Sequence, residues 1–288
     1  MKPAKFTYLR PSSLSEALEL LHRHGEDASL LAGGQSLMPM LNLRFARPAV
    51  LIDIKRIPGL SGIAIGDGVV SIGALTRHFE VAGSPIIRDR LPLVHEALRH
   101  VAHAAIRNRG TFGGSLALAD PAAELPACCV CLDAAISTAS LSGFRSVPAS
   151  KFFRGVYDTA LAHDELISRI EIPLPPDGWT WSFDEVSRRH GDFAVAGIAL
   201  GVRLAGDVIM ESRVAFCGLE AAPRRLAPLE ERLRGVRVGD RIAIGEIATR
   251  LADHVHPLAS EEYPAFYRIE VASALLQRVL ARTSEAIQ

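Results

Sequence analysis

Two short loops with paired glycines lie about eighty residues apart in this 288-residue chain. The first is Ala32-Gly33-Gly34-Gln35-Ser36, and the second is Thr111-Phe112-Gly113-Gly114-Ser115. Glycine lets a backbone approach a ligand closely, and successive N–H groups in such a loop can form a nest for an anion, with a hydroxyl at its edge. Two loops of this kind could hold a pyrophosphate from both sides.

Neither loop belongs to a common phosphate-binding motif. The Gly-x-Gly-x-x-Gly fingerprint of a dinucleotide-binding βαβ unit is missing, and no glycine leads into the Gly-Lys-Ser or Gly-Lys-Thr of a Walker loop. A single glycine pair is most simply a tight turn. Two pairs with flanking hydroxyls instead favour a ligand site, and we expect a dinucleotide held by a different fold.

The first loop is expected to follow a strand. Ser13-Leu14-Ser15-Glu16 has the pattern of a capping box, which predicts a helix that Gly25 ends. Residues 29–31 then form a predicted strand that delivers the chain into the loop, and residues 50–54 form a second strand. Gly66-Asp67-Gly68, between two apolar runs, predicts a hairpin. The loop therefore lies at a strand end, where ligands commonly bind.

The second loop is expected between two helices. One helix is predicted over residues 91–105, and the basic Arg107-Asn108-Arg109 then leads into the loop. Asp120 and Pro121 have the residue types of a helix N-cap and first position, with Glu124 in the first turn of a helix that continues through residue 132. Strands are predicted over residues 135–140, 146–148 and 169–172.

A linker over residues 173–178, rich in proline, predicts a domain boundary near residue 176. Beyond it, residues 181–186, 194–204 and 208–216 predict an antiparallel meander, with helices over residues 242–251 and 264–282 to cover one face. The fold class is α+β. We expect a first domain over residues 1–176, with subdomains of about 1–57 and 58–176, and a C-terminal α+β domain over residues 177–288.

Composition and the character of the N-terminus indicate which partners and which cell compartment to expect. Lysine and arginine number 32 and aspartate and glutamate number 32, so no basic excess favours nucleic acid. The longest apolar runs fall far short of the roughly 20 residues that span a bilayer. The N-terminus lacks the apolar core and cleavage site of a signal peptide. We expect a soluble, cytoplasmic protein without a transmembrane segment.

The four cysteines are too few and too clustered for a disulfide framework. Cys128 and Cys131 have the spacing of a metal or redox pair, but a zinc or iron–sulfur site would need further ligands and no second pair exists. Cysteine also packs readily as a small hydrophobic residue. We therefore expect reduced thiols in the core and no metal site.

The residues in and around the two glycine loops resemble those of a known family. Residues 32–37, followed by 43–48 and 52–54, resemble the first FAD-binding segment of the flavoprotein, or medium, subunits of molybdenum hydroxylases such as carbon monoxide and xanthine dehydrogenases. Residues 106–115 and 119–126 resemble the second segment. Residues 188–194 and the helix around Tyr267-Arg268 also match, so the resemblance covers essentially the whole chain.

The resemblance implies a PCMH-type FAD-binding domain, a C-terminal domain with a three-stranded antiparallel sheet, and noncovalent FAD. In that family both loops hold the pyrophosphate through backbone N–H groups. Hydrogen bonds to the ribose or adenine half are implied for Glu124 and Asp120. The cofactor-binding residues expected on this basis are Ala32, Gly33, Gly34, Gln35, Ser36, Thr111, Gly113, Gly114, Ser115, Asp120, Glu124, Ile167, Asp192 and Phe193.

Several of these residues have an equally ordinary structural interpretation. Asp120 could be only a helix cap, Ile167 could pack in a strand, and Phe193 could either cover a face of the isoalloxazine ring or pack in the sheet. His190 could donate a proton, although a surface turn is the simpler interpretation. No residue set for catalysis of substrate chemistry is evident within this chain.

The chain departs from the family pattern at three places. Leu118 stands where many relatives have histidine, Ser115 where many have asparagine, and Ala104-Ala105 where Pro-Gln is frequent. The glycines remain, but polar contacts from these positions are in doubt. The four-cysteine insertion of the benzoyl-CoA reductase branch is also missing, which argues against that branch.

The function implied is electron transfer. The FAD of this subunit would accept electrons from the [2Fe–2S] clusters of a small subunit, after a large molybdopterin subunit has oxidised the substrate, and pass them to an external acceptor. A dimer of heterotrimers is the expected assembly. A self-sufficient flavin oxidase of the vanillyl-alcohol-oxidase superfamily and a non-catalytic assembly protein with the same fold are the alternatives. The sequence identifies neither the substrate nor the acceptor.

Overall fold

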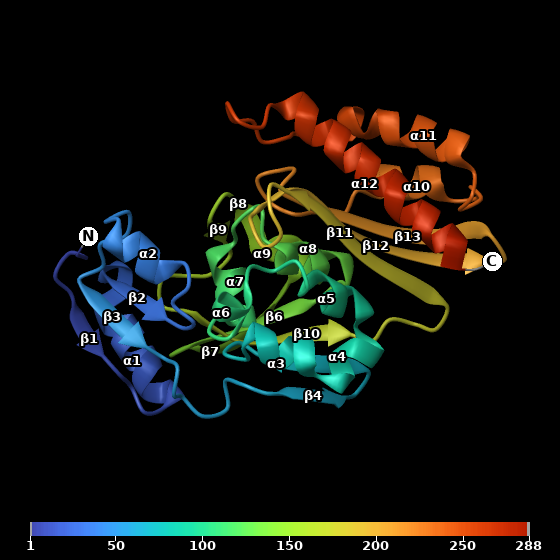
Figure 1. The fold of residues 1–288 in the computed structure, drawn as a ribbon. Coiled ribbons are helices and arrows are strands. Elements are labelled where there is room, and N and C mark those ends of the chain that lie inside the picture. The colour runs from blue at the N-terminus through green and yellow to red at the C-terminus, as the bar shows by residue number, and fades with distance from the viewer. Residues whose placement is uncertain (1, 287–288) are drawn as a thin grey trace.

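The computed structural model describes residues 2–286, and its N-terminal part is a small parallel sheet with two helices (Figure 1). The strands run in the order β1-β3-β2, with both pairs parallel. Ser13 Oγ accepts the Glu16 N–H at 3.1 Å and so starts the first helix as the capping pattern predicts. The elements are β1 (Thr7–Leu9), α1 (Leu14–His24), η1 (Gly25–Asp27), β2 (Ala28–Leu31), α2 (Leu37–Asn42) and β3 (Val50–Asp53).

The middle part is a five-stranded antiparallel sheet with short helices packed on it. Its strands are β4 (Ile63–Gly66), β5 (Val69–Gly73), β10 (Leu166–Pro173), β6 (Ala135–Ser140) and β7 (Gly143–Pro148), in that spatial order. The helices are α3 (His78–Gly83), α4 (Pro85–Arg90), α5 (Pro92–Ala97), α6 (Ala104–Arg107), α7 (Phe112–Leu118), α8 (Glu124–Cys131) and α9 (Ala149–Phe152), with a small ribbon of β8 (Phe153–Gly155) and β9 (Asp158–Thr159).

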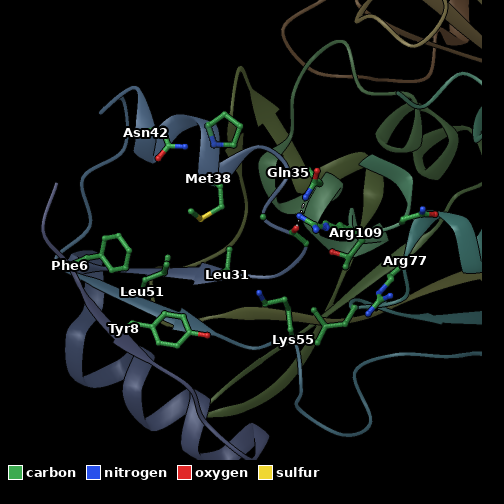
Figure 2. Close-up of a pocket in the computed structure, with 16 residues that line it drawn as sticks. Phe6, Tyr8, Leu31, Gln35, Met38, Asn42, Leu51, Lys55, Arg77 and Arg109 are labelled. Carbon is green, nitrogen blue, oxygen red and sulfur yellow. Dashed lines mark hydrogen bonds between the residues drawn. The ribbon is translucent and has the colours of Figure 1, made fainter. Parts of the chain in front are cut away.

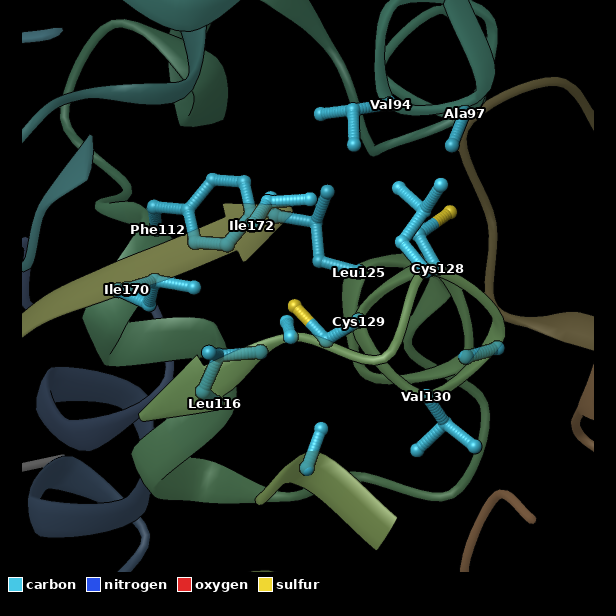
Figure 3. Packing of buried hydrophobic residues seen from close by; sticks show 14 of the residues in the cluster. Val94, Ala97, Phe112, Leu116, Leu125, Cys128, Cys129, Val130, Ile170 and Ile172 are labelled. Atoms are coloured by element: carbon cyan, nitrogen blue, oxygen red, sulfur yellow. The ribbon is translucent and has the colours of Figure 1, made fainter. Parts of the chain in front are cut away.

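The core of the middle part lies between this sheet and α5, α7 and α8 (Figure 3). Phe112 and Leu116 of α7 pack with Leu125 of α8 and with Ile170 and Ile172 of β10. All eight residues of α8 are buried, because the helix is enclosed by elements of the middle part and of the C-terminal part. The second glycine loop therefore precedes a helix that is fixed in the core.

The C-terminal part is a three-stranded antiparallel sheet covered on both faces (Figure 1). One face packs on the C-terminal helices, and the other packs on α5 and α8 of the middle part. Trp181, Phe183 and Cys217 accordingly belong to the same core cluster as α7 and α8. The elements are β11 (Trp179–Ser187), β12 (Ala194–Ala205), β13 (Val208–Cys217), α10 (Ala227–Leu233), α11 (Arg241–Thr249), η2 (Arg250–His254) and α12 (Ala265–Ala286).

Several helices differ from the sequence expectation: α2, α7 and α9 were not predicted, and the second glycine loop forms the first turn of α7. The helix predicted over residues 91–105 is broken into α5 and α6, because Ala102 has a φ of 41° and the Arg107 guanidinium binds the carbonyls of Val101 and Ala102. Asp120 caps a turn through the Ala122 N–H at 2.9 Å, and α8 begins only at Glu124. Helix α10 was not predicted at all.

The cysteines are core residues, as expected. All four are buried free thiols, and burial raises the pKa of Cys131 to about 12. The Cys131 thiol lies 3.5 Å from the Ala199 carbonyl oxygen, to which it donates a weak hydrogen bond. Within residues 2–286, no group of three or more His, Cys, Asp or Glu side chains is arranged to hold a metal ion. In the same residues, no helix combines the length and apolar character that crossing a bilayer requires.

Gly201 gives a direct test of the packing within the C-terminal sheet, where it lies opposite Trp181. A Cβ at this position would overlap the Trp181 ring, so Gly201→Ala should lower the free energy of unfolding by about 1–3 kcal/mol. Gly66→Ala is the matched control because its Cβ would enter open space. Urea unfolding of both variants measures the difference, and equal stability of the two would contradict the packing described.

Candidate cofactor site

All fourteen residues expected to bind the cofactor line one cavity of about 560 Å³. Most come from the two glycine loops, which meet across the cavity, and the rest come from the start of α8, from β10 and from the loop between β11 and β12. A volume of this size is typical of small-molecule and cofactor sites. Segments separated by as much as 160 residues of sequence thus contribute to a single site.

The first loop offers backbone donors that the protein itself does not use. Among residues 2–286, no acceptor is bonded to the N–H groups of Gly33, Gly34, Gln35 or Ser36. Gly34 has a φ of 72°, a conformation that glycine adopts without strain. Four consecutive free donors at the end of β2 form the arrangement that binds an anion through backbone groups.

The second loop is built differently. The N–H groups of Phe112, Gly113, Gly114 and Ser115 are bonded to Thr76 O, Ala74 O, Thr111 Oγ1 and Thr111 O, at 2.9, 2.9, 3.2 and 3.1 Å. Its glycines also serve internal packing, because a Cβ on Gly113 would lie 2.6 Å from the Ala74 Cβ. In this structure the loop therefore gives the cavity a close-packed wall and the Ser115 hydroxyl, while the unused N–H donors belong to the first loop.

Contact between the loops depends on Gly33. A Cβ on this residue would overlap the Arg109 carbonyl oxygen and lie 2.8 Å from the Gly110 Cα. The backbones consequently touch with no side chain between them. This contact fixes the distance between the two walls of the cavity.

His78 supports the second loop from behind and also lines the cavity. Its ring Nε2 lies 3.0 Å from the Thr111 carbonyl oxygen, and its backbone N–H bonds Gly110 O. Burial lowers the pKa of His78 to about 4, so the ring is neutral near pH 7 and Nε2 donates this bond. Because the folded protein disfavours the charged ring, His78 reduces stability as the pH falls from its ordinary pKa of 6.5 toward 4.

Glu124 is a buried acid at the beginning of α8. Burial, together with the negative charges of Glu185 and Asp120, raises the pKa of Glu124 to about 8. Its carboxyl group is therefore neutral at pH 7 and able to donate a hydrogen bond. Asp120 accepts from the Ala122 N–H and, at 3.1 Å, from the Tyr157 hydroxyl, so it is a turn cap and a cavity residue at once.

The C-terminal part closes one end of the cavity through the loop between β11 and β12. Gly191 has a φ of 85°, and a Cβ there would lie 2.8 Å from the His103 ring. The turn therefore packs directly on the segment between α5 and α6. It carries Asp192 and Phe193 to the cavity edge, where the Phe193 side chain is 73% exposed. Phe193 is thus free to contact a ligand and does not pack in the sheet.

Sequence reasoning missed several lining residues. Val101 and Ala102 lie at the turn that replaced the expected helix, and His163 and Glu165 lie just before β10. No local motif marks these positions. Alternation along β2 does not mark them either, since Ser29, Leu30 and Ala32 all line this cavity, whereas Leu31 lines a second cavity on the other side of the loop.

A second cavity of about 920 Å³ lies on that other side of the loops (Figure 2). Phe6, Leu31 and Leu51 form an apolar wall, and Arg77 and Arg109 lie across from them. Five residues line both cavities, namely Gly33, Gly34, Gln35, Leu75 and Thr111. The first glycine loop and Thr111 therefore border both cavities.

The raised pKa of Glu124 predicts how stability depends on pH. The folded state holds the Glu124 proton between the ordinary pKa of 4.5 and the folded value of about 8, so this group lowers stability as the pH rises through that interval. The free energy of unfolding of Glu124→Gln, relative to that of the parent, should therefore increase by roughly 2–5 kcal/mol between pH 5 and pH 8.5. Urea unfolding at both pH values measures it.

Glu165→Gln is the contrasting control. Hydrogen bonds from the Arg145 guanidinium hold the pKa of Glu165 below its ordinary value, so its contribution to stability is present at neutral pH and is lost in acid. Because its folded pKa lies below the ordinary 4.5, the stability of this variant relative to the parent should stay level between pH 5 and pH 8.5 and should recover only in more acidic solution. The same trend in both variants would refute the assignment for Glu124.

Comparison with known proteins agrees with this geometry. Residues 4–175 match the family model of the FAD binding domain in molybdopterin dehydrogenase, and residues 181–283 match that of the CO dehydrogenase flavoprotein C-terminal domain. The chain is 38% identical to the caffeine dehydrogenase subunit beta of Pseudomonas sp. strain CBB1, covering 100% of this chain and 97% of the relative. It is 37% identical to the carbon monoxide dehydrogenase medium chain of Hydrogenophaga pseudoflava, covering 97% of both.

Solved structures show the same fold over almost the whole chain. Carbon monoxide dehydrogenase from Hydrogenophaga pseudoflava matches with a TM-score of 0.92 and 37% identity over 96% of both chains. Quinoline 2-oxidoreductase from Pseudomonas putida 86 matches with a TM-score of 0.94 and 35% identity, covering 100% of this chain and 99% of the other. The chain is therefore an oxidoreductase subunit that belongs to the FAD-binding medium subunits of the molybdenum hydroxylases.

Proposed function

We propose that the cavity of about 560 Å³ binds FAD noncovalently and that this FAD transfers electrons between a partner subunit and an external acceptor. The observation that carries the proposal is the first glycine loop: four of its successive N–H groups have no acceptor among residues 2–286, and its residues line a cavity together with the other expected residues. These donors would hold the pyrophosphate, and Ser115 would add its hydroxyl. No cation is required for this contact.

The two ends of the cavity differ in a way that orients the cofactor. One end, with Ile167 and His163, lies within the first domain, and we assign the adenine half to it. The other end carries the exposed Phe193 and lies beside Asp192, and we assign the isoalloxazine ring to it because electron exchange requires access to other molecules. We assign Glu124 to the isoalloxazine half as well, because the C-terminal part that carries Phe193 also places the charge of Glu185 close enough to act on Glu124, whereas the family resemblance implied the ribose or adenine half.

The bound FAD would supply the redox chemistry, since a flavin accepts electrons singly and can release two together. This chain would position the ring, exclude water from its inner face and hold a neutral carboxyl group, that of Glu124, beside it. A small subunit with two [2Fe–2S] clusters would deliver the electrons. A large molybdopterin subunit would oxidise the substrate, so substrate specificity would lie outside this chain.

The assembly and compartment follow from the same proposal. We infer a dimer of heterotrimers in the cytoplasm, with the first domain over residues 1–176 and the C-terminal domain over residues 177–288. The loop between β10 and β11 supports a boundary near residue 176, although the two domains share one core cluster. They are expected to move as a unit.

A self-sufficient flavin oxidase of the vanillyl-alcohol-oxidase superfamily is the alternative enzyme. Covalent flavin in such enzymes needs a histidine or cysteine at the ring, and no cysteine lines this cavity among the described residues. His78 and His163 line it, but His78 is engaged with Thr111 and His163 lies toward the adenine end. Acid precipitation distinguishes the two, because noncovalent FAD is released into the supernatant.

Co-purification tests the proposed function. The chain should be expressed together with its neighbouring coding sequences and purified through a tag on this subunit. We expect yellow protein that releases FAD on acid precipitation and carries a short chain with iron–sulfur clusters and a long molybdopterin-binding chain. Colourless protein, without FAD after co-expression, would exclude the proposal.

Gly33 provides a sharper test of the loop geometry. Gly33→Ala places a Cβ against the Arg109 carbonyl and should separate the loops, which lowers FAD affinity by roughly tenfold or more. Gly83→Ala at the end of α3 is the control, because a Cβ there meets no other atom within 4 Å. Fluorescence titration of the FAD-free proteins measures both affinities. Unchanged FAD affinity in Gly33→Ala would disprove that FAD binding depends on the contact between the loops.

A further inference from the structure

A line of titratable side chains runs from the cofactor cavity to the protein surface. It begins at Glu124, which lines the cavity, and continues to Glu185 on β11, whose charge acts on Glu124. It then passes to His100, after α5, and ends at the exposed His190 in the loop that follows β11. The line crosses the interface between the middle part and the C-terminal sheet.

The geometry of its middle members is unusual for structural side chains. The Glu185 side chain is 2% exposed, and its Oε1 lies 3.6 Å from His100 Nδ1. Glu185 Oε2 is buried and has no hydrogen-bond partner among residues 2–286. The His100 side chain is 25% exposed, and its ring centroid lies 6.5 Å from that of His190. Solvent therefore reaches one end of a line whose other end opens into the cavity.

A buried carboxyl group that serves structure alone is normally well bonded in proteins. Glu165 in this chain is an example, because it accepts bonds from Arg145, Thr138 and the Ala162 N–H. Glu185, by contrast, has one histidine neighbour and an unbonded oxygen. Such a costly arrangement beside a cofactor cavity is typical of groups that exchange protons.

The other titratable groups around Glu124 and Glu185 do not compete with this pair for the exchange of protons. Cys128 on α8 and Cys217 on β13 face the pair, but burial raises the pKa of both thiols, so they stay neutral. Asp120, before α8, adds a negative charge that disfavours ionisation of Glu124. The negative charge of Glu185 also disfavours ionisation of Glu124, so the Glu124 carboxyl group keeps its proton near pH 7.

We propose that Glu124, Glu185 and His100 store a proton and conduct it between the surface and the bound flavin. The proposal rests on the proposed function, in which the [2Fe–2S] clusters of a partner subunit supply two electrons. Reduction of the flavin by these two electrons takes up a proton, which leaves the Glu124 carboxyl group. The resulting carboxylate is reprotonated from solvent by way of His100 and Glu185, so that charge and protons balance.

Glu124 contacts the cofactor in this scheme, and Glu185 and His100 are positioning residues that act through it. Glu124→Gln preserves the shape and hydrogen-bonding groups but has no proton to give. Glu185→Gln leaves Glu124 in place and interrupts the path to the surface. Glu96→Gln is the matched control: Glu96 on α5 accepts the Phe183 N–H at 2.9 Å close to this region but does not line the cavity.

The test uses the FAD-loaded protein, mixed rapidly with reduced methyl viologen, a one-electron donor whose oxidation releases no proton, in weakly buffered solution containing a pH indicator. In the parent at pH 7, flavin bleaching should precede proton uptake from solvent, because the stored proton is used first. In Glu124→Gln, bleaching should slow by about tenfold or more and follow solvent proton uptake. Glu185→Gln should keep the fast bleaching of a first turnover and slow the subsequent uptake. Glu96→Gln should behave as the parent does.

Infrared spectroscopy provides a second readout that does not depend on flavin reduction. The FAD-free parent at pH 7 should show the C=O band of a buried protonated carboxyl group, and Glu124→Gln should lack it. A parent without this band, or parent-like bleaching in Glu124→Gln, would overturn the inference. Absorbance of bound FAD in the samples prepared for rapid mixing keeps the outcomes separate, because protein that binds no FAD would refute the proposed function instead.

Discussion

The direct backbone contact between the two glycine loops is the constraint on which the cofactor site depends. Gly33 touches the carbonyl of Arg109, and any side chain on it would separate the loops. The first loop ends a strand of the N-terminal sheet, and the second opens α7 on the middle sheet. One contact without side chains therefore joins two sheets and sets the width of the cavity between them.

The C-terminal sheet contributes through the way it is covered. Its second face packs on α5 and α8, so the turn at Gly191 is held against His103 and carries Phe193 to the cavity edge. The same packing places Glu185, on that face of β11, behind Glu124. Because the sheet is buried on both faces, acidic side chains on it are kept away from water, and this changes their chemistry as well as stabilising the fold.

Local patterns in the sequence predicted much of this arrangement. The cap at Ser13, the hairpin at Gly66-Asp67-Gly68 and the three C-terminal strands all depend on neighbouring residues, and each is present. The break after α5 was not predictable, since it depends on the Arg107 guanidinium folding back on Val101 and Ala102. The partnership of Glu124 with Glu185 was also invisible, because 61 residues separate them and only tertiary packing brings them together. The paired glycines and the family resemblance both implied free N–H groups in the two loops, and among the described residues only the first loop offers them.

Gly33, Gly34 and Gln35 line both cavities. A molecule in either cavity would therefore rest on the same peptide groups. Thermodynamic linkage would make any resulting influence mutual: whatever change in affinity an occupant of the larger cavity imposed on the cofactor, the cofactor would impose equally in return. The shared residues thus give the two cavities a physical route by which filling one can change the affinity of the other.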